Sequence, residues 1–206
     1  MDNIFFDLRK LKYLGVNAIV GKTVRIRRPE ECIIGDGAIV DEFAYVSCSI
    51  EIGRYCHIAS HVSISGGAGK LTLGAYSTIS NHCSVHCASS DYVDISLDLP
   101  SVPPDLRFGG TVGDVVIDDY VVVGAHSCVL PGVRLPRGAA FGAYSLIANV
   151  QYQPMCLYVG IPAKLHKKRS VPLCTPEELR RLLEGSSREP RHPADQSTTE
   201  GSNTRV

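Results

Sequence analysis

Residues 34–64 read IGDGAIVDEFAYVSCSIEIGRYCHIASHVSI, with isoleucine or valine at every sixth position. The spacing continues in two further registers, over 73–85 and 117–147. The anchors are Ile34, Val40, Val46, Ile52, Ile58, Ile64, Leu73, Ile79, Val85, Ile117, Val123, Val129, Leu135, Phe141 and Ile147. Since 44% of the chain is apolar, chance gives this pattern about once in a thousand. A short fixed period of this kind is typical of a solenoid.

The position four residues after an anchor holds a small side chain in most rungs. These residues are Ala38, Ala44, Cys56, Val62, Ala68, Ser77, Cys83, Ser89, Val121, Ser127, Val133, Ala139 and Ser145. Alternation around each anchor favours short strands, and the Gly, Asp and Asn residues between them favour tight turns. Three rungs would make one coil of a triangular prism, with coils about 4.8 Å apart. We therefore expect the anchors and the small residues to share a narrow interior.

Two interruptions break the register. The first, Gly66-Gly67-Ala68-Gly69, lengthens one coil. It lacks the leading glycine and the final Ser/Thr of a phosphate-binding loop, so we do not interpret it as one. The second is an insertion over 90–114 that is rich in proline and aspartate. A loop of this length is either functional or a tolerated surface excursion.

The rest of the chain flanks this repeat. We expect an N-terminal cap segment over 1–30, formed by a short amphipathic helix or an irregular segment. The β-helix domain covers 31–165. Over 166–206 we expect a short helix that begins at Thr175, followed by a disordered tail.

Composition narrows the function classes. The net charge is zero, which gives no sign of nucleic-acid binding. No apolar run is long enough for a membrane span, and the first residues do not resemble a secretory signal. The eight cysteines are scattered without metal-finger spacing. We therefore expect a reduced, cytoplasmic protein with no bound metal.

The repeat resembles that of the hexapeptide-repeat acyltransferases. The most specific parts are residues 123–133 (VGAHSCVLPGV) and 158–164 (YVGIPAK), the second similar to a closing G-x-P-A-[K/R] motif. The resemblance covers about 31–169 and is strongest to the sugar and lipopolysaccharide O-acetyltransferase branch. It implies an all-β solenoid, namely a left-handed parallel β-helix, that assembles as a homotrimer. It also implies acetyl transfer to a hydroxyl or amine of a sugar, either a nucleotide sugar or a surface-polysaccharide precursor.

The resemblance further implies that acetyl-CoA, as co-substrate, lies between neighbouring subunits near the C-terminal coils. Backbone groups of small residues would line its pantetheine arm, at Gly124, Ala125, Gly142 and Ala143. Basic residues would meet its phosphates, at Lys164, Lys167, Lys168 and Arg169. Two other interpretations stay open: the glycines could serve solenoid turns, and the basic run could be a solvated charge cluster.

Acyl transfer needs a base for the acceptor's proton and a donor for the oxyanion, and histidine suits the first task. In maltose-type members of the family the base begins the inserted loop, where this chain has Ser90 followed by Asp91. Two histidines lie just upstream. His82 stands at the rung position of the base in sugar N-acetyltransferases, and His86 is expected to point outward before the loop. Asp91 or Asp94 could orient either imidazole.

The acceptor candidates are Asn81, beside His82, and three loop residues, Tyr92, Asp94 and Arg107. The absence of the loop histidine keeps open a second interpretation, a β-helix scaffold or assembly protein that has lost its base. A third, a metalloenzyme resembling γ-carbonic anhydrases, needs three zinc histidines shared between subunits. The long Asp/Pro loop argues against it.

Overall fold

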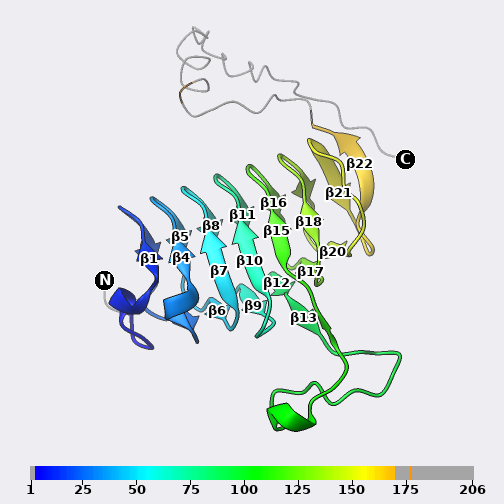
Figure 1. Ribbon diagram of the computed structural model, residues 1–206. Coiled ribbons are helices and arrows are strands. Elements are labelled where there is room, and N and C mark those ends of the chain that lie inside the picture. The colour runs from blue at the N-terminus through cyan, green and yellow to red at the C-terminus, as the bar shows by residue number, and fades with distance from the viewer. Residues whose placement is uncertain (1–2, 170–176, 178–206) are drawn as a thin grey trace, which may run out of the picture. The chain divides into compact units, whose positions relative to one another are not determined.

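The computed structural model describes residues 3–169 and Glu177, and residues 3–169 form a triangular solenoid (Figure 1). The first sheet contains β1 (Tyr13–Leu14), β4 (Ile33–Ile34), β7 (Ser49–Ile52), β10 (Lys70–Leu73), β15 (Val115–Ile117) and β18 (Arg134–Leu135). The second contains β2 (Ile19–Val20), β5 (Ile39–Val40), β8 (His57–Ile58), β11 (Thr78–Ile79), β16 (Val122–Val123), β19 (Ala140–Phe141), β21 (Cys156–Val159) and β22 (Lys164–Lys168). The third contains β3 (Arg25–Ile26), β6 (Tyr45–Val46), β9 (Ser63–Ser65), β12 (Ser84–His86), β17 (Cys128–Val129) and β20 (Leu146–Ile147).

Each coil gives one short strand to each sheet, and successive coils pair in parallel, as Ile34 with Ile52 and Val40 with Ile58. All fifteen sequence anchors point inward and are at most 1% exposed. Because large aliphatic side chains fill the axis from coil to coil, their burial supplies the main stabilising term. The predicted β-helix is confirmed.

The small-residue positions are also interior, with two exceptions. Ser77, Ser127 and Ser145 are buried, and each hydroxyl donates to a backbone carbonyl of its own or an adjacent coil. Ala68 is exposed because it falls in the first interruption, and Ser89 is only half-buried because it directly precedes the second.

The solenoid begins one coil earlier than the six-residue register. β1, β2 and β3 form a complete coil within the segment expected to act only as a cap. Leu14, Val20 and Ile26 keep the spacing of six, but a 3-10 turn, η2 (Pro29–Glu31), adds two residues before Ile34. Ahead of this coil lies an irregular segment with one 3-10 turn, η1 (Leu8–Lys10).

The insertion leaves the prism at the corner between the third and first sheets. A two-residue antiparallel pair, β13 (Ala88–Ser89) with β14 (Thr111–Val112), closes its base. Beyond this pair the loop projects away from the coils and carries a 3-10 turn, η3 (Pro104–Leu106) (Figure 1). The expected helix from Thr175 and the tail lie outside the described residues, apart from Glu177.

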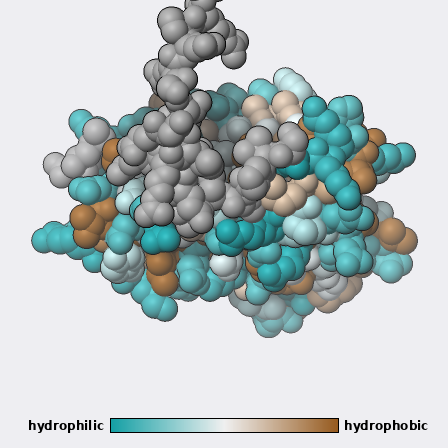
Figure 2. Space-filling model, turned by 90° about the horizontal axis from the view of Figure 1, so that it is seen from above, coloured by the Kyte–Doolittle hydropathy of each residue, from teal (hydrophilic) through white to brown (hydrophobic). Residues whose placement is uncertain are grey.

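The surface of residues 3–169 carries both hydrophilic and apolar side chains. Seen from above, it is mostly hydrophilic, with apolar side chains in separate places (Figure 2). Among the described residues, no helix has the length and apolarity needed to cross a bilayer.

Candidate active site

A column of stacked rings runs along the corner between the second and third sheets. Its members stand three residues after consecutive anchors of the second sheet and have φ between 58° and 63°. They are Phe43, His61, His82, His126 and Tyr144. Neighbouring ring centroids lie 4.7–4.9 Å apart. The candidate base His82 is thus covered on both ring faces by imidazoles, and only its edges remain free.

The residues expected to line the pantetheine arm lie on this same corner, one and two coils beyond His82. A Cβ on Gly124 would approach the backbone nitrogen of Ala143 to 2.5 Å, and one on Gly142 would approach Val159 Cγ1 to 2.9 Å. Close stacking of the coils therefore requires Gly124, and the Val159 side chain leaves little room for a Cβ at Gly142. Ala125 is half-buried and Ala143 exposed, so small side chains leave the backbone of this corner open.

The basic run forms the last strand of the second sheet. β22 pairs antiparallel with β21, and Gly160 to Ala163, from the predicted closing motif, make the turn between them. Lys164, Lys167 and Lys168 are exposed. Arg169 differs from them because its Nη1 donates to the carbonyl oxygen of Gly138 at 2.7 Å. The three lysines and the remaining N–H groups of Arg169 can all meet an anion.

His86 ends β12, at the root of the inserted loop. Its outward, half-buried imidazole places Nδ1 3.1 Å from the hydroxyl oxygen of Ser65 on the preceding coil. Burial lowers the pKa of His86 from its ordinary value, because desolvation disfavours the charged ring. At neutral pH the imidazole is therefore uncharged, which a general base must be.

The two candidate bases lie near opposite ends of β12, an inner strand of the third sheet. His82 lies two residues before β12 and His86 ends it, so the four steps between them span up to about 13 Å of chain at strand spacing. Asn81, next to His82, donates through Nδ2 to the hydroxyl of Ser60 at 3.0 Å. Within one chain, one acceptor atom cannot contact both imidazoles at this separation.

The loop residues do not bond to either imidazole. The Asp91 carboxylate accepts from the backbone amides of Val93 and Asp94 at 2.8 and 3.0 Å. These hydrogen bonds, that from Asp94 first, lower the pKa of Asp91. Tyr92 is 90% exposed. Within residues 3–169, therefore, the Asp91 carboxylate shapes a turn and forms no hydrogen bond with His82 or His86.

Arg107, expected to contact the acceptor, forms hydrogen bonds within the loop. Its Nε donates to the carbonyl of Val102 at 2.6 Å and its Nη2 to that of Pro100 at 2.8 Å. Asp98 accepts from the hydroxyl of Ser96 at 3.0 Å. The projecting loop thus has internal order of its own.

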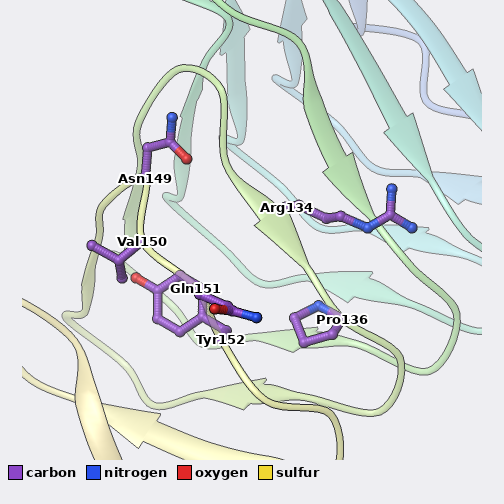
Figure 3. Close-up of a pocket in the computed structure, with 6 residues that line it drawn as sticks. All are labelled: Arg134, Pro136, Asn149, Val150, Gln151 and Tyr152. Carbon is purple, nitrogen blue, oxygen red and sulfur yellow. The ribbon is translucent and has the colours of Figure 1, made fainter.

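A hollow of about 470 Å³ lies near the C-terminal coils, and sequence reasoning did not find it. Its lining residues are Arg134, Pro136, Asn149, Val150, Gln151 and Tyr152 (Figure 3). The guanidinium of Arg134 extends away from residues 149–152 in this view and pairs with Asp118, Nη2 to Oδ1 2.8 Å. The Tyr152 hydroxyl donates to the Ala148 carbonyl. The lining of the hollow combines polar and apolar surface, and its guanidinium already pairs with a carboxylate.

His57, which lies outside the candidate site, contacts an acidic side chain. His57 Nε2 lies 2.7 Å from the Asp41 carboxylate on the outer surface of the second sheet.

No group of three His, Cys, Asp or Glu side chains suited to a metal ion occurs among the residues that the structure describes.

The comparisons agree with this fold and repeat. The family model of bacterial transferase hexapeptide repeats matches residues 31–66. The dTDP-4-amino-4,6-dideoxy-D-glucose acyltransferase of Escherichia coli is 33% identical over 175 residues, which are 81% of this chain and 89% of that protein. The putative lipopolysaccharide biosynthesis O-acetyl transferase WbbJ of Escherichia coli K12 is 30% identical over 139 residues, 65% of this chain and 67% of that one.

Comparison with solved structures also indicates this fold. A variant of AntD, an N-acyltransferase from Bacillus cereus in complex with dTDP-4-amino-4,6-dideoxyglucose and coenzyme A, superposes with a TM-score of 0.76 at 26% identity. The match covers 89% of this chain and 98% of AntD. The fold and repeat define a left-handed β-helix protein. The chain belongs to the hexapeptide-repeat acyltransferases and is an enzyme of that class.

Sequence reasoning missed Ser65 and the ring column. The column had a visible signal, since five aromatic residues stand at the same offset from consecutive anchors. Ser65 had none, because its contact depends on the pairing of β9 with β12.

Proposed function

We propose that this enzyme transfers an acyl group from acyl-CoA to the amine of a nucleotide-linked amino sugar. The observation that carries the proposal is the near-complete match to AntD, whose structure holds such an amino sugar together with coenzyme A. The Escherichia coli relative named for the same dTDP-linked sugar supports it. Another AntD complex contains 3-hydroxybutyryl-CoA, so the donor could carry an acetyl or a longer acyl group.

The reaction forms an amide and releases a thiol. The amine nitrogen attacks the thioester carbonyl, the C–S bond breaks, and the proton lost by nitrogen ends on the CoA sulfur. A base near the amine promotes this step by taking the proton. We propose His86 for that role, since it is uncharged at neutral pH and held at the root of the loop. His82 then serves the ring column.

The CoA arm would follow the corner at Gly124, Ala125, Gly142 and Ala143, where small side chains leave the backbone accessible. The lysines of β22 would meet its phosphates through charge. Both assignments agree with the position of these residues on the C-terminal coils, beyond the coil that carries His86.

We propose that the active unit is a homotrimer, as the family resemblance implies. The inserted loop supports an interface, because its apolar side chains have little to pack against within one chain. Tyr92, Val93 and Ile95 are each at least 90% exposed. Apolar residues this exposed favour a partner surface. We also expect a neighbouring subunit to add contacts to the acceptor beside those of Asn81, Tyr92 and Asp94. A cytoplasmic location fits an enzyme that uses acyl-CoA and nucleotide sugars.

The test is an assay of free-thiol release from acetyl-CoA and 3-hydroxybutyryl-CoA. The acceptors are dTDP-4-amino-4,6-dideoxyglucose, its 4-hydroxy counterpart and a free amino sugar, with products identified by mass. We expect an N-acylated product from the nucleotide amino sugar. Product from the hydroxy sugar alone would instead support O-acylation, as in the name of the WbbJ relative. Release with none of the acceptors, without binding of acyl-CoA, would support the scaffold interpretation.

A further inference from the structure

Ser65 and His86 are brought together by a local lengthening of the third sheet. Strands β3, β6, β17 and β20 each have two residues, whereas β9 and β12 have three. The extra pair is Ser65 with His86. Since Ile64 and Val85 point into the core, Ser65 and His86 both point outward on the same surface.

The glycine-rich interruption makes this lengthening possible. Gly66 has φ +125°, and a Cβ there would come within 2.4 Å of the Ala88 nitrogen. The Cys87 amide donates to the Ser65 carbonyl at 2.6 Å, which fixes the backbone on either side of the pair. The turn from Gly66 to Gly69 therefore packs closely against the backbone of the strand that leads into the loop.

We infer that Ser65 is the positioning residue for His86, holding its imidazole in the tautomer that leaves Nε2 free to accept a proton. This inference rests on the proposed role of His86 as base. A serine oxygen can accept a hydrogen bond as well as donate one. With Nδ1–H donating to Ser65 Oγ, the lone pair of the neutral ring lies on Nε2. After proton uptake the same Nδ1–H bond persists, so the ring need not turn during the reaction.

The geometry favours Ser65 over Asp91 as the partner of the His86 imidazole. Nδ1 is 3.1 Å from Ser65 Oγ, within hydrogen-bond range. The carboxylate of Asp91, expected from sequence to fill this role, is engaged with backbone amides. A hydroxyl is a weaker partner for an imidazolium than a carboxylate. A base held this way keeps a low pKa, in agreement with the direction that burial gives it.

The test is the pH profile of kcat/KM for Ser65→Ala, Ser65→Thr and Ser65→Asp, with Ser63→Ala as matched control. Ser63 lies on the same surface of β9, opposite Ser84. In Ser65→Ala we expect kcat to fall about tenfold with little change in KM. Its acid limb should move to lower pH, because the imidazolium loses a hydrogen bond. Ser65→Asp should move the limb to higher pH, and Ser65→Thr and Ser63→Ala should resemble the parent protein. An acid limb that stays in place in both Ser65→Ala and Ser65→Asp would overturn the inference.

A second measurement separates this inference from the role of the base. Nitrogen NMR of the histidine rings, with the His86 signals assigned by His86→Asn, reports the tautomer without turnover. We expect Nδ1–H in the parent protein and a mixture in Ser65→Ala. An unchanged tautomer would refute the role of Ser65 even if His86 is the base. Full activity in His86→Ala would refute the base and leave the tautomer result to decide on Ser65.

Discussion

The imidazole of His82 lies flat on that of His126, with ring centroids 4.9 Å apart and ring planes within 5° of parallel. On its other side it stacks on His61 at 4.7 Å. Stacked rings at this spacing stabilise each other by burying their surfaces. His82, one of the two bases that the sequence offers, is therefore part of a column of stacked rings along one corner of the solenoid.

The column predicts that His82 tolerates other planar rings. His82→Ala removes two ring contacts and should lower the free energy of unfolding by about 1–3 kcal/mol. His82→Tyr should restore most of this and keep acyl transfer within about threefold of the parent enzyme. Urea unfolding and thiol release, measured on both variants, provide the check. Loss of activity in His82→Tyr with normal stability would return His82 to the role of base.

Close stacking of the coils predicts a stability cost at Gly124 that is independent of ligand. Gly124→Ala places a Cβ 2.5 Å from the Ala143 nitrogen, and such overpacking should destabilise the protein by about 1–3 kcal/mol. Thermal unfolding without CoA measures it. Unchanged unfolding together with a higher KM for acyl-CoA would show that Gly124 serves only the cofactor arm.

The two hydrogen bonds of Arg107 predict a role in the order of the loop. Arg107→Ala should increase proteolytic cleavage within 90–114 and leave the main unfolding transition unchanged, since the loop lies outside the core. Arg107→Lys should be intermediate, because an ammonium group cannot reproduce the forked geometry. Limited proteolysis with mass mapping gives the answer. Equal cleavage in all three proteins, with a raised KM for the acceptor, would favour direct substrate contact.

The lowered pKa of His86 predicts how stability changes with acid. Below the ordinary value of 6.5, the unfolded chain binds a proton that folded His86 does not, so stability falls as pH falls. The decline ends once the pH is below the folded pKa. His86→Asn should therefore show a shallower loss of unfolding free energy between about pH 7 and pH 5. Urea titrations at several pH values test this, and identical slopes in both proteins would contradict it.

The sequence predicts the core better than the site, for a physical reason. The interior of a narrow prism accepts one large and one small side chain per rung, so the period is visible in residues such as Ile58 and Val62. The first coil escapes notice because the η2 turn shifts its register by two residues. Among surface contacts, the ring column follows this period, but the contact between Ser65 and His86 does not. The Ser65–His86 pair exists only because two strands are one residue longer than their neighbours, and no local pattern records that.

The contacts of the expected loop residues were likewise not predictable from the sequence. Their composition indicates a functional insertion, but what Asp91 and Arg107 contact depends on how the loop folds on itself. Both side chains are engaged with the loop backbone. Their type alone could not distinguish that role from substrate binding.

The most direct test of the central claim compares two alanine variants in one assay. Thiol release from acetyl-CoA with dTDP-4-amino-4,6-dideoxyglucose is followed for the parent enzyme, His86→Ala and His82→Ala, at a temperature where all three are folded. We predict a loss of about a hundredfold or more in kcat for His86→Ala and less than about tenfold for His82→Ala. The reverse order, or full activity in His86→Ala, would contradict the account.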